Sequence, residues 1–314
     1  MTPGRSAARE KRWVDLSPHT NAFLEANGVR LNYLDWGGSG PILILIPGAF
    51  DNAHCFDGLA PTLTDRFRVI AYSRRGHGKS PAKRPYDRHT LVEDLHGILN
   101  RLGIERAHLA GWSMGGVIEV TGMALAHPQR VGRIVYLDGA LDLSGSRWAR
   151  VTSSYFAAHP VPKDVTGSLD AWWKNWSEKF PGTIHFHDYE AAVRDGVTLR
   201  PDGSVRPRMS DQVAQEIWTT VNTYRPEYSK IRVPALAIYA ETFLDVDNGT
   251  PSQRADHRAW ERKMKSWRVS CMSQVQRELA GVSITSVPGC HGDLFLRSKK
   301  EVADSMQRFL SASP

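Results

Sequence analysis

The sequence predicts an α/β fold in which a mostly parallel sheet is covered by helices on both faces. Short, strongly apolar segments such as residues 41–46 (PILILI) have the composition of strands buried on both faces. Segments with helical periodicity, such as residues 91–102, lie between these strands. Because strand and helix alternate along most of the chain, the strands are expected to run parallel, with helices as the connections.

Seven strands are expected. Residues 28–36 alternate polar and apolar side chains, as an edge or half-exposed strand does. The remaining strands are expected at residues 41–46, 67–72, 107–110, 133–138, 234–240 and 282–287. Those at 41–46 and 107–110 are apolar enough to be buried.

Four helices are expected. Residues 91–102 are stopped by Gly103, residues 114–126 end at His127-Pro128, and residues 300–310 close the chain. Within residues 250–281, four side chains are spaced four, three and four apart and predict one apolar helix face: Trp260, Met264, Trp267 and Cys271. The opposite face is expected to be solvated and basic: Arg258, Arg262, Lys263, Lys265 and Arg268.

Residues 142–230 interrupt the alternation because they contain no strong apolar strand. They are rich in tryptophan: Trp148, Trp172, Trp173, Trp176 and Trp218. We interpret this segment as a mostly helical lid over the C-terminal edge of the sheet. The core domain is then formed by residues 22–141 and 231–314.

Composition excludes several classes of protein. With 314 residues, 41% hydrophobic and 23% charged, the chain has the balance of a soluble globular protein. It contains neither an apolar run of ~18 residues nor an N-terminal secretory signal, so we expect a cytoplasmic protein without membrane association. The net charge of +7 is dispersed, which does not indicate a nucleic-acid surface. The three cysteines are widely spread and predict free thiols.

The motif GWSMGG, residues 111–116, presents Ser113 as a candidate nucleophile. The spacing G-x-S-x-G is typical of a sharp strand-to-helix turn that exposes a serine hydroxyl. An apolar strand precedes the motif and a helical segment follows it, which is the order such a turn requires. The alternative is a serine that only caps the helix.

A nucleophilic serine needs a base and an oxyanion hole. His291, in PGCHGD, directly follows the last expected strand and is the histidine best placed to act as the base. The alternative is a plain turn histidine. The backbone N–H groups of Ala49 and Met114 are expected to hold the oxyanion. The side chains expected to border the substrate pocket are Phe50, His54 and Trp112.

The segments PGAF, RRGHGKS, GWSMGG and PGCHGD occur in the order found in α/β-hydrolases, and the chain resembles that family from about residue 22 onward. The resemblance implies a Ser113 nucleophile, a His291 base and a lid at residues 142–230. It does not fix the substrate, because one fold carries many activities.

The sequence departs from the family pattern at the acid that orients the histidine. Most members place this acid after the penultimate strand, where the present chain has Phe243. Asp245 could take the role from a slightly longer turn. We favour Asp138, which follows the strand after the nucleophile helix, because certain haloalkane dehalogenases and some lactone-cleaving relatives carry the acid there. The alternative for Asp138 is a structural aspartate that closes a strand.

The sequence therefore predicts a cofactor-independent serine hydrolase, without a metal, that acts on small carboxylic esters or lactones. The tryptophans of the predicted lid favour a hydrophobic or aromatic substrate. An aminopeptidase, a carbon–carbon bond hydrolase and a non-catalytic small-molecule receptor remain alternatives on the same fold. Dehalogenase and epoxide-hydrolase chemistry is disfavoured, because those relatives attack with a carboxylate and this chain has Ser113. The sequence does not predict the oligomeric state.

Overall fold

The computed structural model describes residues 14–145, 148–149, 168–179, 187–202, 204–247 and 250–312. The side chains of residues 175–179 are not included. The side chain of Trp176 and parts of the predicted lid, including residues 150–167 and 180–186, thus lie outside the described residues.

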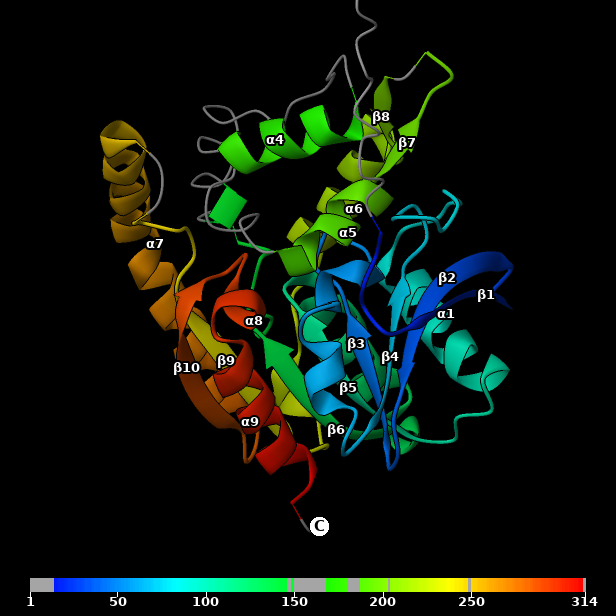
Figure 1. The fold of residues 1–314 in the computed structure, drawn as a ribbon. Helices are drawn as coiled ribbons and strands as arrows, with labels where there is room; N and C mark the ends of the chain where they lie inside the picture. The colour runs from blue at the N-terminus through cyan, green and yellow to red at the C-terminus, as the bar shows by residue number, and fades with distance from the viewer. Residues whose placement is uncertain are drawn as a thin grey trace, which may run out of the picture.

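An eight-stranded sheet forms the centre of the molecule (Figure 1). In chain order its strands are β1 (Thr20–Ala26), β2 (Val29–Gly37), β3 (Ile42–Ile46), β4 (Arg68–Ser73), β5 (Ala107–Trp112), β6 (Val131–Leu137), β9 (Ala235–Thr242) and β10 (Ser283–Cys290). Their spatial order is β1-β2-β4-β3-β5-β6-β9-β10. From β4 to β10 neighbouring strands are parallel, whereas β2 is antiparallel to both β1 and β4. The predicted α/β class is confirmed.

The strand β1 was not predicted from the sequence, and it covers the edge of β2. Of the two alternatives for residues 28–36, the edge strand is wrong, because β2 lies between β1 and β4 and β1 forms this edge of the sheet. The half-exposed strand agrees with the structure, since buried and more exposed residues largely alternate along β2. The strand β1 pairs with β2 along its full length, from Thr20–Asp35 to Ala26–Val29. Its segment TNAFLEA is mostly exposed or half-buried, so its residues carry little of the apolar signal that marks a strand.

Alternate residues of the central strands point into two separate cores. In β3, Ile44 and Ile46 pack into one core, and Leu43 and Leu45 pack into the other. This division explains why the segment is apolar throughout: both of its faces are covered by helices.

Each core is covered by its own helices. The first is covered by α1 (Arg88–Arg101), the π-helix η3 (Gly115–Val120), α2 (Thr121–Ala126), α6 (Asp211–Thr223) and α7 (Pro251–Glu278). The second is covered by η1 (Ala53–Phe56), η2 (Ala60–Leu63), α8 (Leu294–Arg297) and α9 (Lys299–Leu310). The predicted helix at 114–126 is therefore present as η3 followed directly by α2.

The remaining elements are short, and most of them belong to residues 142–230. They are η4 (Pro128–Arg130), α4 (Leu169–Lys179), η5 (His187–Tyr189), α5 (Glu190–Asp195), β7 (Val197–Leu199), β8 (Val205–Pro207) and η6 (Tyr228–Lys230). Figure 1 shows α4, α5, β7 and β8 together at one end of the sheet. Asn52, in the loop after β3, donates to the Ala192 carbonyl of α5 at 2.8 Å, so α5 lies over the carboxyl end of β3.

Two further findings concern the described residues as a whole. None of their helices combines the length and the apolar character that a membrane crossing requires. The three cysteines, Cys55, Cys271 and Cys290, are buried and free, as predicted.

Candidate active site

Ser113 lies in a sharp turn between β5 and η3. Its φ is +52°, in the left-handed region that residues other than glycine rarely adopt. The turn requires the flanking glycines. A Cβ at Gly111 would lie 2.5 Å from the backbone of Gly115, and one at Gly115 would lie 2.5 Å from the Ile46 carbonyl oxygen. The structure therefore forms the strand–turn–helix arrangement that GWSMGG predicts.

His291 joins Ser113 to Asp138. Its Nε2 lies 2.9 Å from Ser113 Oγ, and its Nδ1 lies 2.7 Å from Asp138 Oδ2. Ser113, Asp138 and His291 follow the carboxyl ends of β5, β6 and β10, respectively. The parallel sheet thus brings together three side chains that lie far apart in the sequence. The arrangement has the order nucleophile, base, orienting acid that serine catalysis requires.

The carboxylate of Asp138 is completely buried and is stabilised by a buried arginine. Arg268 Nη1 lies 3.3 Å from Asp138 Oδ2, and Nη2 lies 3.4 Å from Oδ1. Arg268 Nη2 also donates to the Ala240 carbonyl at 2.6 Å. Burial by itself would raise the pKa of Asp138, but the charge of Arg268 and the hydrogen bond from His291 outweigh it and lower this pKa below its ordinary value. Asp138 is therefore ionised at neutral pH.

The turn after β9 supplies a packing surface for the histidine. The Phe243 ring is stacked on the His291 imidazole, with the ring centroids 4.1 Å apart and the planes 9° from parallel. Glu261 of α7 accepts hydrogen bonds from the backbone N–H of Phe243 and of Leu244, at 2.7 and 2.5 Å. Asp245, the alternative acid, instead forms an ion pair with Arg297 at 2.7 Å.

A buried ion pair holds the loop after β3. The Arg74 guanidinium donates to the carbonyl oxygens of Pro47 and Gly48 and to Glu119 Oε1, each at 2.6 Å. Arg74 and Glu119 are 1% and 0% exposed, so this contact is shielded from solvent. Glu119 belongs to η3, and the ion pair therefore ties the loop to the helix that follows Ser113.

The two expected oxyanion-hole residues lie on segments that touch. Ala49 directly follows the loop carbonyls that Arg74 holds, and Met114 is the first residue after the nucleophile. A Cβ at Gly115 would lie 2.6 Å from the Pro47 carbonyl oxygen, which shows how closely the start of η3 approaches the loop.

The three expected pocket residues have different positions. Phe50 is 50% exposed and has a φ of +67°. Trp112 is 6% exposed, and its Nε1 donates to the His291 carbonyl at 2.8 Å. His54 is 3% exposed, with Nδ1 2.9 Å from Asp57 Oδ2. The structure thus places Phe50 at the surface, Trp112 beneath the histidine loop and His54 in the interior.

Aromatic rings extend from the histidine to Phe50. The Trp148 ring stacks on Trp267 with centroids 4.7 Å apart and contacts Phe243 at 5.5 Å. Its centroid lies 6.4 Å from that of Trp218, which in turn lies 5.9 Å from that of Phe50. We call these rings, Phe50, Trp148, Trp218, Phe243 and Trp267, the aromatic wall. Because Trp148 and Trp218 belong to the predicted lid, the aromatic wall joins the lid segment to the core.

Arg268 was expected on a solvated face of the helix at 250–281, and this prediction is wrong. The four apolar side chains are buried in α7 as predicted, but Arg268 is also buried, at 7% exposure. It follows Met264 by four residues and therefore lies on the same side of the helix. This spacing could have identified it. Glu261, adjacent to the buried Trp260, gave no comparable signal.

As the pH rises from 5 to 8, the wild type should lose about 1 kcal/mol of its free energy of unfolding relative to the Asp51→Asn variant. Burial raises the pKa of Asp51 to about 6, although Tyr189 Oη donates a hydrogen bond to its carboxylate. The stability that this group contributes is fully present below about pH 4 and is lost as the pH rises through the folded pKa. Urea unfolding at both pH values measures the difference.

The exposed Asp65→Asn variant serves as the control. Equal pH dependence in the wild type and in Asp51→Asn would contradict the assignment of a raised pKa to Asp51.

Comparison with known proteins identifies the family. A model of the alpha/beta hydrolase fold matches residues 41–242, more than half of the chain. The chain belongs to the alpha/beta hydrolase family. The family match covers Ser113 and Asp138, and His291 lies beyond it.

Individual relatives differ in how much of this alpha/beta hydrolase they match. It is 36% identical over 208 residues to the 2-hydroxymuconate semialdehyde hydrolase of Pseudomonas sp. (strain CF600), covering 63% of this chain and 66% of that protein. Three uncharacterized mycobacterial proteins, from Mycobacterium bovis and M. tuberculosis, are 34% identical over 122 residues, 38% of this chain, and the chain spans 35% of their length.

Solved structures extend the likeness in fold. The structure of E-2-(acetamidomethylene)succinate hydrolase superposes with a TM-score of 0.75 at 20% identity, covering 94% of this chain and 100% of that chain. The enol-lactonase of Burkholderia xenovorans LB400 has a TM-score of 0.60 at 21% identity, covering 92% and 100%.

Proposed function

We propose that this alpha/beta hydrolase cleaves carboxylic esters or lactones through an acyl-enzyme formed on Ser113. The observation that carries the proposal is the pair of hydrogen-bond distances at His291, 2.9 Å to Ser113 Oγ and 2.7 Å to Asp138 Oδ2. Both fall within the range in which a base can accept the serine proton while an acid orients its ring.

In the first half-reaction, His291 Nε2 accepts the Ser113 proton as Oγ attacks the substrate carbonyl carbon. The carbonyl oxygen becomes an oxyanion, which the N–H groups of Ala49 and Met114 stabilise. The imidazolium then gives its proton to the leaving alkoxide, so an alcohol departs and the acyl group remains on Ser113. For a lactone, the same alcohol stays attached to the acyl chain.

In the second half-reaction, His291 takes a proton from water, and the resulting nucleophile attacks the acyl-enzyme. Collapse of the second tetrahedral intermediate returns the proton to Ser113 and releases the carboxylic acid. Asp138 holds the imidazole with Nε2 toward Ser113 and stabilises its cationic form in both steps. Phe243, stacked on the ring, and Arg268, paired with Asp138, act as positioning residues.

Residues 142–230 are proposed to act as the lid, and residues 22–141 and 231–314 as the core. The aromatic wall supports this division, since Trp148 and Trp218 of the lid segment contact Phe243 and Phe50 of the core. A wall of this kind favours a hydrophobic or aromatic small-molecule substrate, because flat apolar groups pack well on aromatic rings.

Cleavage of a carbon–carbon bond is the second candidate. It is favoured by the similarity to the 2-hydroxymuconate semialdehyde hydrolase, which covers 63% of this chain. The leaving group would then be a carbanion equivalent, which His291 protonates at carbon.

A panel of aryl esters, lactones, aryl amides and vinylogous diketones distinguishes these functions. Turnover of esters or lactones above that of the other classes is the expected result. Preference for the diketones would replace the proposal with the second candidate, and preference for amides would indicate an aminopeptidase. Tight binding without turnover of any class would indicate a receptor.

Asp138→Asn is expected to lower kcat/KM for the best ester by about 10⁴. An amide at this position allows the wrong imidazole tautomer and does not stabilise the imidazolium. Steady-state kinetics with purified protein measures the loss.

Asp245→Asn is the matched control, because Asp245 is the other candidate acid and pairs with Arg297. Its rate should remain within about tenfold of the wild type. A large loss in Asp245→Asn with near-normal activity in Asp138→Asn would assign the acid to Asp245.

A further inference from the structure

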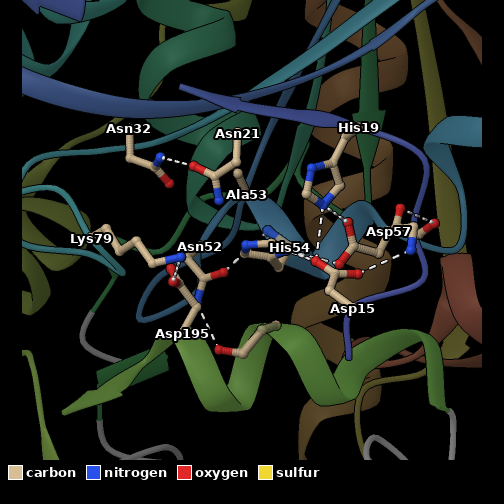
Figure 2. Close-up of polar contacts among 12 residues, drawn as sticks. Asp15, His19, Asn21, Asn32, Asn52, Ala53, His54, Asp57, Lys79 and Asp195 are labelled. Carbon is tan, nitrogen blue, oxygen red and sulfur yellow. Dashed lines mark hydrogen bonds and ion pairs between the residues drawn. The ribbon is translucent and has the colours of Figure 1, made fainter. Parts of the chain in front are cut away.

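Two histidines and two aspartates converge beside η1, and none of them contacts Ser113 or His291 in the part of the chain that the structure describes. We call Asp15, His19, His54 and Asp57 the His/Asp cluster. One ligand atom from each of the four side chains can be chosen so that all lie within 4.8 Å of one another. Figure 2 shows the four side chains pointing toward a common point, two from the segment before β1 and two from η1 and its end.

The distances between the histidine nitrogens and the carboxylate oxygens are close to those of a four-coordinate site, and the two shortest are hydrogen bonds in this structure. His19 Nε2 lies 3.1 Å from Asp15 Oδ2 and 3.5 Å from Asp57 Oδ1. His54 Nδ1 lies 3.4 Å from Asp15 Oδ2 and 2.9 Å from Asp57 Oδ2. Tetrahedral ligands at zinc bond lengths are separated by about 3.3–3.6 Å, so small adjustments of these side chains would suffice.

The charges of the cluster also favour a cation. Two carboxylates face each other, and the only cationic or titratable nitrogens of the described residues within ion-pair distance of them belong to His19 and His54. Asp57 Oδ1 is buried and has no hydrogen-bond partner. Such an acceptor normally has a donor or a cation beside it. A divalent ion would neutralise both carboxylates and bind this oxygen.

The carboxylate of Asp15 is held in position by the backbone. Ser17 N donates to Asp15 Oδ1 at 3.0 Å, which leaves Oδ2 facing the histidines. Ser17 Oγ accepts from Trp36 Nε1 at 2.8 Å and donates to the Asp57 carbonyl at 3.3 Å. This network orients the ligand before any ion binds, which is typical of a built metal site.

We propose that the His/Asp cluster binds one zinc ion through His19 Nε2, His54 Nδ1 and the carboxylates of Asp15 and Asp57. Four protein ligands close the coordination sphere, which is typical of a structural site. The ion would fasten residues 14–19 to η1, the helix that follows the oxyanion loop. Both histidines bind as neutral imidazoles, so protons bound to the ligand atoms are released as zinc enters. The proposal is independent of the activity at Ser113.

A second histidine cluster provides a matched control. Glu93, His96 and His127 also lie within ligand distance of one another. Arg130 Nη1 lies 2.9 Å from His96 Nε2, however, so this cluster already has a guanidinium beside it, which disfavours a second cation. We expect no zinc at this second cluster.

The experiment uses the full chain, stripped of metal with a chelator and titrated with Zn²⁺ in a calorimeter. One zinc ion per chain is expected, with the thermal-unfolding midpoint raised by about 5 °C at a hundredfold excess over the dissociation constant. Cobalt bound in its place should show the intense visible absorption of four-coordinate Co²⁺. His19→Gln and Asp57→Asn should each weaken zinc binding by at least about 100-fold.

The variants at the buried His19 and Asp57 side chains could lose zinc because they fail to fold. Asp15→Asn avoids this ambiguity, because the Asp15 side chain is 25% exposed and its substitution should leave the fold intact. It should also lose the zinc affinity. His96→Gln and His291→Ala should bind zinc as the wild type does. Absence of stoichiometric binding, an octahedral cobalt spectrum, or full binding by Asp15→Asn and Asp57→Asn would overturn the proposal. Loss of zinc in His291→Ala alone would place the ion at the candidate active site instead.

Discussion

Ser113→Ala is expected to lower the rate of ester cleavage by about 10⁶. The hydroxyl supplies the atom that becomes acylated, and His291 lies 2.9 Å from it to accept its proton. Removal of this atom leaves only the binding and oxyanion contributions, which by themselves give an acceleration of about 10³–10⁴ over water. Initial rates with a fluorogenic ester, measured at high enzyme concentration, reach this range.

The fold of Ser113→Ala should be unchanged, because the two glycines that the turn requires are retained. Ser305→Ala in α9 is the control, since this serine lies on a helix remote from the site. A Ser113→Ala enzyme that retained more than about a hundredth of the wild-type rate would contradict the assignment of the nucleophile.

His291→Ala is expected to cost 10⁴–10⁶ in kcat/KM, because the serine then has no base. The variant leaves a gap beside Phe243, Asp138 and Ser113, all of which contact the imidazole in the wild type. Exogenous imidazole should enter this gap and restore part of the activity in a concentration-dependent manner. Kinetics with and without imidazole measure both effects.

The exposed His89→Ala variant controls for the loss of a histidine in general. A merely structural role for His291 would lower stability without rescue by imidazole.

The sequence predicts most of the sheet because its inner strands are covered on both faces. Segments such as residues 42–46 and 235–240 are apolar throughout, which is the composition of strands buried on both faces. The edge strand β1 is different, since one of its edges and much of its surface are exposed. Its sequence therefore carries only a weak strand signal.

The turn after β9 could not be resolved from sequence. Whether Asp245 reaches the histidine depends on how the backbone folds after Phe243. Glu261 of α7, which follows Phe243 by 18 residues, fixes that backbone by accepting hydrogen bonds from the N–H groups of Phe243 and Leu244. Arg268 likewise reaches Asp138 across 130 residues of chain. Such contacts are set by packing of α7 on the sheet, which the local pattern around either residue does not encode.

Closeness in the sequence did not predict which of the side chains after β3 lie at the surface near the candidate site. His54 and Phe50 lie four residues apart, yet Phe50 is half exposed and His54 is buried against Asp57. The intervening chain turns into η1, which carries His54 toward the segment before β1 (Figure 2).

Covalent labelling with an aryl or alkyl fluorophosphonate, read by peptide mass spectrometry, tests the central claim most directly. One adduct per chain is expected, on Ser113, formed rapidly in the wild type, slowly in His291→Ala and not at all in Ser113→Ala. An adduct on another residue, or equal labelling of the wild type and Ser113→Ala, would contradict it.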